Sequence, residues 1–241
     1  IKLNFYKFKL DKIKIISENE FISKLLDLQY IDFKDNNFDN LISEMKHLSR
    51  DVNWAKGWPE DDVSFWNAEA FMWCNKISAN KRKQIQEELL ALLLIDKVNI
   101  NLDLGAGGFS YIPSIAFDFS KKMLSYNDNA IKKIEGDLGE KLPFEDNYFD
   151  SITAIFVFNY VKNLNLILKE IKRVLKKDGI CIIVQNAKKI NDWQRQKEKN
   201  EFNENNTSSW FNFFTSFGFE VNLTLKNNLL FFKLKNNSNH Y

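Results

Sequence analysis

The sequence predicts an α/β fold in which helices cover both faces of a parallel sheet. From about residue 97 onward, short apolar runs typical of strands alternate with helical segments. One of these runs, GICIIVQN at 179–186, is apolar enough to be buried on both faces, as central parallel strands are. A glycine-rich turn, NLDLGAGGFS at 101–110, follows the first strand of this part.

Residues 1–96 form the other part, which the apolar spacing predicts to be helical and rich in aromatic residues. No linker rich in Gly, Ser or Pro follows it, so we expect a helical N-terminal extension packed on a domain of residues 97–241. The last of its helices is predicted to begin at a capping residue, Ser78 or Asn80. The four predicted helices lie within 18–31, 37–48, 61–77 and 78–95.

In the second part, three helices lie between the strands. The first is capped by Ser120, the second runs over 165–179 with Lys176 and Lys177 near its end and Gly179 as its stop, and the third ends at Gly218. The last two strands are joined by KNN and predict a closing hairpin. The predicted strands are 98–104, 114–119, 131–137, 149–159, 179–186, 219–225 and 229–235.

Composition excludes several classes of protein. Lys and Arg (34) nearly balance Asp and Glu (32), so the net charge of +2 does not favour a nucleic-acid-binding surface. Cys74 and Cys181 are far apart and have no metal-ligand spacing, and Cys181 is expected to be a small buried apolar side chain. The longest apolar run, 89–95, is too short to span a bilayer, and no signal peptide opens the chain. We therefore expect a cytoplasmic protein without a metal site.

Acidic residues end consecutive predicted strands behind the glycine turn. Asp118 ends the second strand, where a carboxylate can accept hydrogen bonds from both hydroxyls of a ribose. Asp137 ends the third strand, where an acid and the next backbone N–H can bind the edge of an adenine. In open parallel sheets, ligands bind at this edge. The alternatives are that the glycines only reverse the chain and that each acid only caps the next helix.

Four segments together resemble class I S-adenosylmethionine-dependent methyltransferases of the methyltransferase domain 11 kind. They are LDLGAGG (102–108), AFDFSKKML (116–124), EGDLGEKLPFEDNYFDSI (135–152) and LKEIKRVLKKDGICII (168–183). The resemblance implies a Rossmann-like, seven-stranded, mostly parallel sheet whose last strand runs antiparallel. It also implies S-adenosyl-L-methionine as the cofactor.

The resemblance further implies which residues bind this cofactor. Asp103 and the backbone of Gly105, Ala106 and Gly107 would hold its methionine part. Asp118 would bind the ribose, and Phe119 would cover the adenine. Asp137, assisted by the Leu138 backbone, would bind the adenine amino group. Phe156 would lie near the methyl group.

The chain departs from the family between Gly107 and the second strand. Only about six residues stand where the family usually has a full helix, and Pro113 limits any helix there. The first helix is therefore expected to be shortened or reduced to a turn. This weakens the contribution of a helix terminus to anion binding.

The end of the fourth predicted strand and the residues that follow it, FVFNYVKN, indicate which kind of methyl acceptor is expected. Asn159 and Tyr160 are candidate catalytic residues that would orient an acceptor, or they are ordinary loop residues. The prolines typical of amino-directed nucleic-acid methyltransferases are absent here, which disfavours that substrate class. Methyl transfer needs alignment more than a base, so having only two histidines is compatible with it.

The sequence favours a methyltransferase acting on a small molecule or a peptide. A non-catalytic relative that keeps the fold is the alternative, and an RNA methyltransferase is a third, disfavoured one. Four tryptophans precede the second part and could line a substrate pocket or pack as core; we favour core for Trp66 and Trp73 and leave Trp54 and Trp58 open. The polar segment 191–210 is either a substrate-facing insert or a solvated loop.

Overall fold

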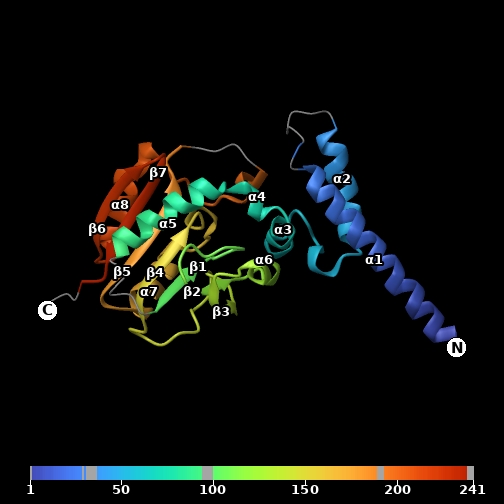
Figure 1. The fold of residues 1–241 in the computed structure, drawn as a ribbon, viewed down its shortest axis with the longest axis horizontal. Helices are drawn as coiled ribbons and strands as arrows, with labels where there is room; N and C mark the ends of the chain where they lie inside the picture. The colour runs from blue at the N-terminus through green and yellow to red at the C-terminus, as the bar shows by residue number, and fades with distance from the viewer. Residues whose placement is uncertain (1, 29, 31–36, 94–99, 189–192, 238–241) are drawn as a thin grey trace.

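The computed structural model of the chain describes residues 2–28, 30, 37–93, 100–188 and 193–237. Seven strands form one sheet in the order β3-β2-β1-β4-β5-β7-β6 (Figure 1). Strands β1 to β5 pair in parallel, and β7 is antiparallel to both β5 and β6. The predicted sheet is therefore confirmed. Its strands are β1 (Asn101–Leu104), β2 (Ser114–Asp118), β3 (Ala130–Glu135), β4 (Phe149–Ile155), β5 (Leu175–Asn186), β6 (Glu220–Lys226) and β7 (Leu229–Lys235).

Successive residues of a strand point to opposite faces of the sheet. Because both faces carry apolar side chains, helices cover both of them. Cys181 and Ile183 of β5 are buried in the core beneath α7 (Leu164–Val174) and α8 (Thr207–Ser216). Ile182 and Val184 pack on the other face, against α5 (Ala79–Leu93). The prediction that Cys181 is buried is confirmed.

The second predicted helix of this part ends earlier than expected. Helix α7 stops at Val174, and Leu175 turns into an extended conformation that pairs with Phe149 of β4. Lys176 and Lys177 thus belong to β5 and not to the helix. Gly179 is not a helix stop, because it also lies within β5, and Asp178 takes the left-handed conformation at φ +61°. Sheet pairing of Leu175 overrides the helical spacing that the sequence continues through this segment.

The predicted helix at 61–77 is two helices, α3 (Asp62–Glu69) and α4 (Trp73–Lys76). No glycine or proline marks the break between them. The fully buried carboxylate of Glu69 joins them, because Lys76 Nζ lies 2.5 Å from Glu69 Oε2. Gln194, from the segment after β5, donates to the same oxygen. Helix α5 is capped as expected at Ser78, whose hydroxyl accepts from the Lys81 N–H.

No helix forms between β1 and β2, a stretch the structure describes completely, so the expected reduction to a turn is confirmed. The buried side chain of Asn127 holds the turn in place of helical hydrogen bonds. Its Nδ2 donates to the Gly107 carbonyl (3.2 Å) and its Oδ1 accepts from the Ser110 N–H (3.1 Å). Asn127 follows α6 (Lys121–Tyr126), the short helix that Ser120 caps as predicted.

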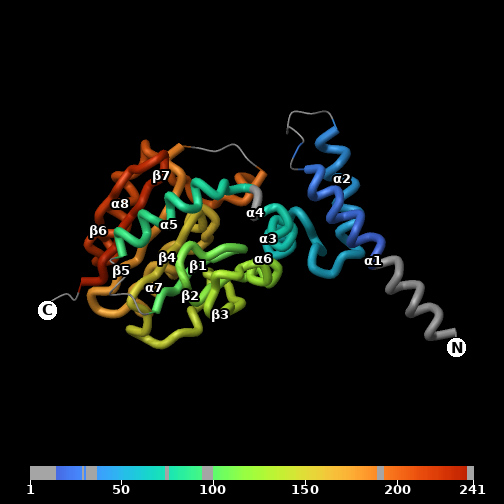
Figure 2. The backbone as a smooth tube through the Cα atoms, viewed as in Figure 1, coloured from blue at the N-terminus to red at the C-terminus, as the bar shows by residue number. Residues whose placement is uncertain are grey.

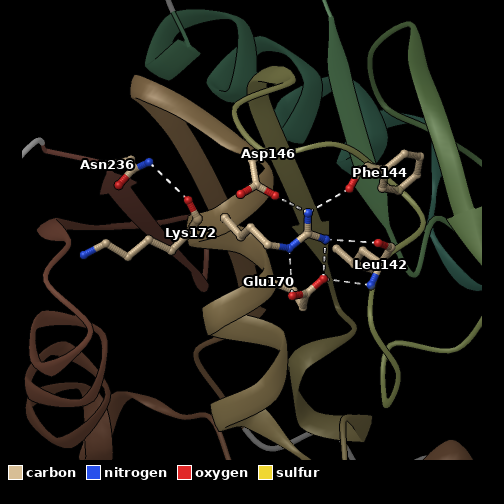
Figure 3. Close-up of polar contacts among 7 residues, drawn as sticks. Leu142, Phe144, Asp146, Glu170, Lys172 and Asn236 are labelled. Carbon is tan, nitrogen blue, oxygen red and sulfur yellow. Dashed lines mark hydrogen bonds and ion pairs between the residues drawn. The ribbon is translucent and has the colours of Figure 1, made fainter.

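The connection between β3 and β4 is fixed by one arginine (Figure 3). Arg173 of α7 donates to the carbonyls of Leu142 (3.0 Å) and Phe144 (2.7 Å). It also pairs with Glu170 and Asp146, and this guanidinium keeps the pKa of Glu170 below its ordinary value. The loop that begins at Asp137 is therefore anchored to the sheet domain.

The first two helices, α1 (Lys2–Leu28) and α2 (Phe38–Ser49), lie away from the sheet, and α3 lies next to α6 (Figures 1 and 2). Trp58 and Trp54 pack with Phe21 in an aromatic cluster of these helices, which assigns both to core packing. None of the helices in the described ranges has the length and apolar character of a membrane span. The boundary at residue 96 stays a prediction.

Candidate functional site

The site starts at the turn that follows β1. Gly105 and Gly107 both have left-handed backbone conformations, with φ of +58° and +56°. A Cβ added to Gly105 would come within 2.2 Å of Val157 Cγ2. No other residue therefore fits there unless Val157, which follows β4, is displaced. The turn thus brings bare backbone against the chain that follows β4.

Asp118, at the end of β2, pins this turn. One carboxylate oxygen accepts from the Gly107 N–H (2.9 Å) and the other from the Ser120 N–H (2.8 Å). Only 6% of the residue is exposed, and burial raises the pKa of Asp118 to about 6. The backbone donors oppose that rise by stabilising the carboxylate. Asp118 therefore shapes the turn as well as presenting its edge to the cleft.

Asp103, in β1, lies beneath the turn. Its Oδ1 accepts from the Thr153 hydroxyl of β4 at 2.8 Å, and the residue is 2% exposed. Burial raises the pKa of Asp103 to about 7, and the neighbouring Asp118 carboxylate adds to the rise. Asp103 is absent from the walls of the cleft described next.

One end of the cleft is a cavity of about 420 Å³. Phe119, Asp137 and Leu138 form the wall contributed by the ends of β2 and β3. The opposite rim is charged: Asp62 of α3 pairs with Lys162 (3.0 Å) and with Lys197 (2.9 Å). A volume in this range suits a small-molecule ligand.

The other end of the cleft is much narrower. Above Gly105 and Gly107 the free volume is about 60 Å³, and its walls are almost wholly apolar. The Trp73 indole lies over the turn, with Nε1 3.4 Å from the position of a Cβ on Gly107. Trp66 packs edge-to-face on Tyr160 at 4.8 Å and lines both ends of the cleft. Both tryptophans contribute to the core, as favoured, and both also line the site.

Most of the residues predicted for the site line one cleft. The eight that do are Gly105, Gly107, Asp118, Phe119, Asp137, Leu138, Phe156 and Tyr160. Asp103, Ala106 and Asn159 are not among its walls. Phe156 has a left-handed conformation at φ +56°, which is unfavourable for an aromatic residue and is held by its N–H bonding to Val184. The functional roles of all eleven stay predictions.

Asn159 faces a different partner from the one proposed. Its side-chain Nδ2 donates to Glu198 (3.1 Å), and its backbone carbonyl accepts from the N–H groups of Lys199 and Asn200. Its Oδ1 is buried without a hydrogen-bond partner. The segment after β5 is therefore packed onto the site, since Trp193 also enters the aromatic cluster beside Trp58 (5.9 Å).

Sequence reasoning missed two features of the site. Nothing in the sequence distinguishes Asn127 from any other loop asparagine, yet it replaces the absent helix as the support of the glycine turn. The position of Trp73 over the glycines was also not foreseen, because it depends on the break between α3 and α4. No group of His, Cys, Asp or Glu in the described ranges could hold a metal ion.

Residues 102–183 match the family model described as a methyltransferase domain. A sterol 4-C-methyltransferase of Caenorhabditis elegans is 42% identical over 60 residues, which is 25% of this chain and 18% of that protein. A demethylmenaquinone methyltransferase of Bacillus pumilus is 29% identical over 130 residues, which is 46% of this chain and 55% of that protein. The matches thus span about half or less of these relatives' own lengths.

Solved structures share the fold at lower sequence identity. A SAM-dependent methyltransferase from Archaeoglobus fulgidus aligns with a TM-score of 0.54 at 13% identity, covering 64% of this chain and 94% of the other. A Haloferax volcanii structure of the Trm112 methyltransferase activator with a methyltransferase gives a TM-score of 0.52 at 15% identity, covering 72% and 98%. Residues 102–183 therefore match a methyltransferase domain, and the solved structures show that the sheet has the fold of methyltransferases.

Proposed function

We propose that the chain is an S-adenosyl-L-methionine-dependent methyltransferase that acts on a small molecule or a peptide. The observation that carries the proposal is a single cleft joining a bare glycine turn to carboxylates at the ends of two neighbouring strands. Asp118 and Asp137 stand in the two parts of this cleft, which share Phe119, Leu138 and Tyr160. The family match to a methyltransferase domain supports the same assignment.

The residues present suit the adenosine part of the cofactor. The cavity of about 420 Å³ offers an aromatic face at Phe119 and a carboxylate at Asp137 beside the Leu138 backbone. Asp118, already bonded to the turn, would accept from the ribose. The amino-acid tail would lie over Gly105 and Gly107, where about 60 Å³ is free, so this part is accommodated once the Trp73 indole moves aside.

When bound, S-adenosyl-L-methionine supplies a methyl group on a sulfonium, which a nucleophile takes by in-line displacement. The chain's own residues exclude water from this region, because Trp66, Trp73 and Phe156 line it with apolar surface. Tyr160 stands where an acceptor would be oriented, and alignment of this kind contributes roughly 7–11 kcal/mol in the best cases. Asn159 has an indirect role, because it holds the segment after β5 in place through its hydrogen bond to Glu198.

A non-catalytic binding protein of the same fold is the second candidate. The observation that favours it is the Trp73 indole over the glycine turn, which leaves little room for the reacting part of the cofactor. A [4+2]-cyclase also shares the fold, with a TM-score of 0.52 at 12% identity, so the fold by itself does not fix the reaction. The near-neutral charge gives no support to an RNA methyltransferase. We also propose a cytoplasmic location, which the sparse, distant cysteines support.

Titration calorimetry with S-adenosylhomocysteine tests the proposal. We expect binding by the full chain, and about tenfold weaker binding by Asp137→Ala, because one charge-assisted hydrogen bond is lost. Glu135→Ala is the matched control, since Glu135 is also exposed, lies two residues earlier and does not line the cleft. Absence of binding by the unsubstituted chain would overturn the proposal.

A second measurement separates the two candidates. Purified chain is incubated with methyl-labelled cofactor and fractionated extracts of small molecules and peptides. A methyltransferase transfers label to at least one fraction, whereas a binding protein holds the cofactor and transfers none.

A further inference from the structure

A second cavity, of about 600 Å³, shares Trp73 with the narrow end of the cleft. Its other walls come from Phe71, from Gly108 and Phe109 after the glycine turn, and from the stretch 126–129. None of the residues proposed to bind the cofactor lines it. The cavity is therefore a separate space, and it is large enough for a small-molecule ligand.

Aromatic rings from separate elements supply almost all of the apolar side chains in this cavity. They are Phe71, Trp73, Phe109 and Tyr126. Tyr126, the last residue of α6, packs edge-to-face on Phe71 with 6.1 Å between the ring centroids, and half of its surface is exposed. A planar ring that enters the cavity can stack on such side chains. The walls therefore favour an aromatic ligand over an aliphatic one.

The bare backbone of Gly108 lets two of these rings approach each other. A Cβ on Gly108 would lie 3.2 Å from Trp73 Cδ1 and 3.7 Å from Tyr126 Cβ. The φ of Gly108 is not in the left-handed region, unlike those of Gly105 and Gly107, so the backbone conformation does not require glycine here. What the glycine provides is room between Trp73 and Tyr126.

Two of the lining residues have hydrogen-bond acceptors that the protein does not use. Within the part of the chain that the structure describes, the Asp128 carboxylate has no hydrogen-bond or ion-pair partner. Asn129 donates through Nδ2 to the Ser110 carbonyl (2.6 Å), and its Oδ1 accepts from no described residue. Arg82 is already engaged, with its guanidinium 4.8 Å from the ring centroid of Phe109, so we assign it no ligand. The cavity thus suits a ligand that brings hydrogen-bond donors.

We propose that this cavity binds a planar aromatic compound that carries a hydroxyl or amino group. The ring lies between Trp73 and Tyr126, and the hydroxyl or amino group donates to the Asp128 carboxylate. The inference goes beyond the proposed function and does not depend on it, since Tyr126 and Asp128 have no part in binding the cofactor. It adds a second ligand site that meets the cleft at one side chain, Trp73.

Two probes with the same ring test this inference. 5-Hydroxyindole has the hydroxyl donor, and in 5-methoxyindole a methyl group blocks it. NMR titration of the full chain should show saturable binding of both, with 5-hydroxyindole about fivefold tighter. Asp128→Ala should remove that difference by weakening 5-hydroxyindole alone. Tyr126→Ala should weaken both probes at least about fivefold, because a stacking ring is lost.

Matched variants show whether the probes bind elsewhere. Tyr148→Ala is the control for Tyr126→Ala, since Tyr148 is 40% exposed and lines neither this cavity nor the cleft. Asp137→Ala is the control for Asp128→Ala, because Asp137 is the exposed carboxylate of the wide end. Both controls should leave both affinities within about twofold. Thermal unfolding confirms that each variant is folded.

Competition separates the cavity from the cleft. Saturating 5′-methylthioadenosine, a nucleoside without the amino-acid tail of S-adenosylhomocysteine, should not displace the probes. The inference is overturned if neither probe binds, if Asp128→Ala or Tyr126→Ala leaves both affinities unchanged, or if Asp137→Ala or the nucleoside reduces probe binding. A chain that binds the probes as expected and does not bind S-adenosylhomocysteine would count against the proposed function alone.

Discussion

The cleft has a cavity of about 420 Å³ between Phe119 and Asp137, whereas above Gly105 and Gly107 only about 60 Å³ is free. The wide end is bordered by charged side chains that water reaches, and the narrow end is lined by indole and phenyl rings. The two ends also differ in how their carboxylates are held. Asp137 is exposed, while Asp103 and Asp118 are buried under the turn.

This difference indicates that the two ends bind by different means. The wide end has room for a small molecule as it stands. The narrow end has its polar groups already bonded to the protein, and an aromatic side chain covers it. A ligand that enters there must displace the Trp73 indole. The buried carboxylates of Asp103 and Asp118 below the turn reduce the stability of the fold when they are ionised. The predictions below test each part of this contrast.

The largest expected effect concerns the buried carboxylate beneath the narrow end. With the pKa of Asp103 raised to about 7, the folded chain holds a proton there that the unfolded chain releases near pH 4. The folded state thus binds more protons, and stability falls as pH rises from about 4 to about 7. Asp103→Asn removes this loss. We expect about 1–4 kcal/mol more stability at pH 8 and about a third of that gain at pH 5, because pH 5 lies only about one unit into the window.

Urea denaturation of Asp103→Asn at the two pH values measures this. Asp137→Asn is the control, since water already solvates that exposed carboxylate and its removal should alter stability little at either pH. If Asp103→Asn destabilises the chain equally at pH 5 and pH 8, its bond to Thr153 matters more than its burial.

The second prediction concerns the cover of the narrow end. Trp73→Ala removes the indole from Gly107, so that no half-buried side chain has to be displaced by a ligand's tail. Displacing such a surface costs roughly 1–2 kcal/mol. We therefore expect about tenfold tighter S-adenosylhomocysteine binding and a smaller change for 5′-methylthioadenosine. Calorimetry reports both values.

Trp54→Ala is the matched control for Trp73→Ala, because Trp54 is also half-buried and packs in the same aromatic cluster without lining the cleft. Its affinities should equal those of the unsubstituted chain. Weaker binding by Trp73→Ala would show that the indole contacts the ligand and is part of the site.

The sequence predicts the features of the fold that depend on neighbouring residues, and it does not predict those that depend on contacts between distant elements. The existence of the strands, the closing hairpin and the Ser120 cap follow from local patterns, because apolar alternation and capping residues act over a few positions. The seven-stranded, mostly parallel sheet follows from the family resemblance. The end of α7 follows from neither, because Leu175 leaves the helix to pair with a strand that is distant in sequence.

In the site, the strand-end residues Asp118 and Asp137 could be placed because the topology brings consecutive strand ends to one edge. Two features of the narrow end could not be placed in this way. Trp73 reaches the glycines through a helix break that no glycine or proline marks, and Asn127 supports the turn through tertiary hydrogen bonds. Both depend on contacts between separate elements, and local patterns carry no information about these.

The smallest expected effect is at the charged rim of the wide end. Asp62 bonds Lys197 and Lys162, so it joins α3 to the segments after β5 and β4. Burial opposes ionisation of Asp62, but the two lysines prevail and lower its pKa below 3.8. Its contribution is therefore present above pH 4 and lost as pH falls through the lowered value. We expect Asp62→Asn to cost about 0.5–1 kcal/mol at pH 7 and less at pH 2.

Urea denaturation and adenosine calorimetry check the rim prediction. Lys162→Gln is the control for Asp62→Asn, since Lys162 is 71% exposed and its loss leaves the better-buried Lys197 pair in place, so its cost should be smaller. Adenosine affinity should stay within about twofold for both variants, because the wide end is open and its walls at Phe119 and Leu138 are unchanged. A large loss of adenosine binding in Asp62→Asn would mean that the lysine-bridged rim shapes the wide end, and the contrast between a ready cavity and a covered one would then fail.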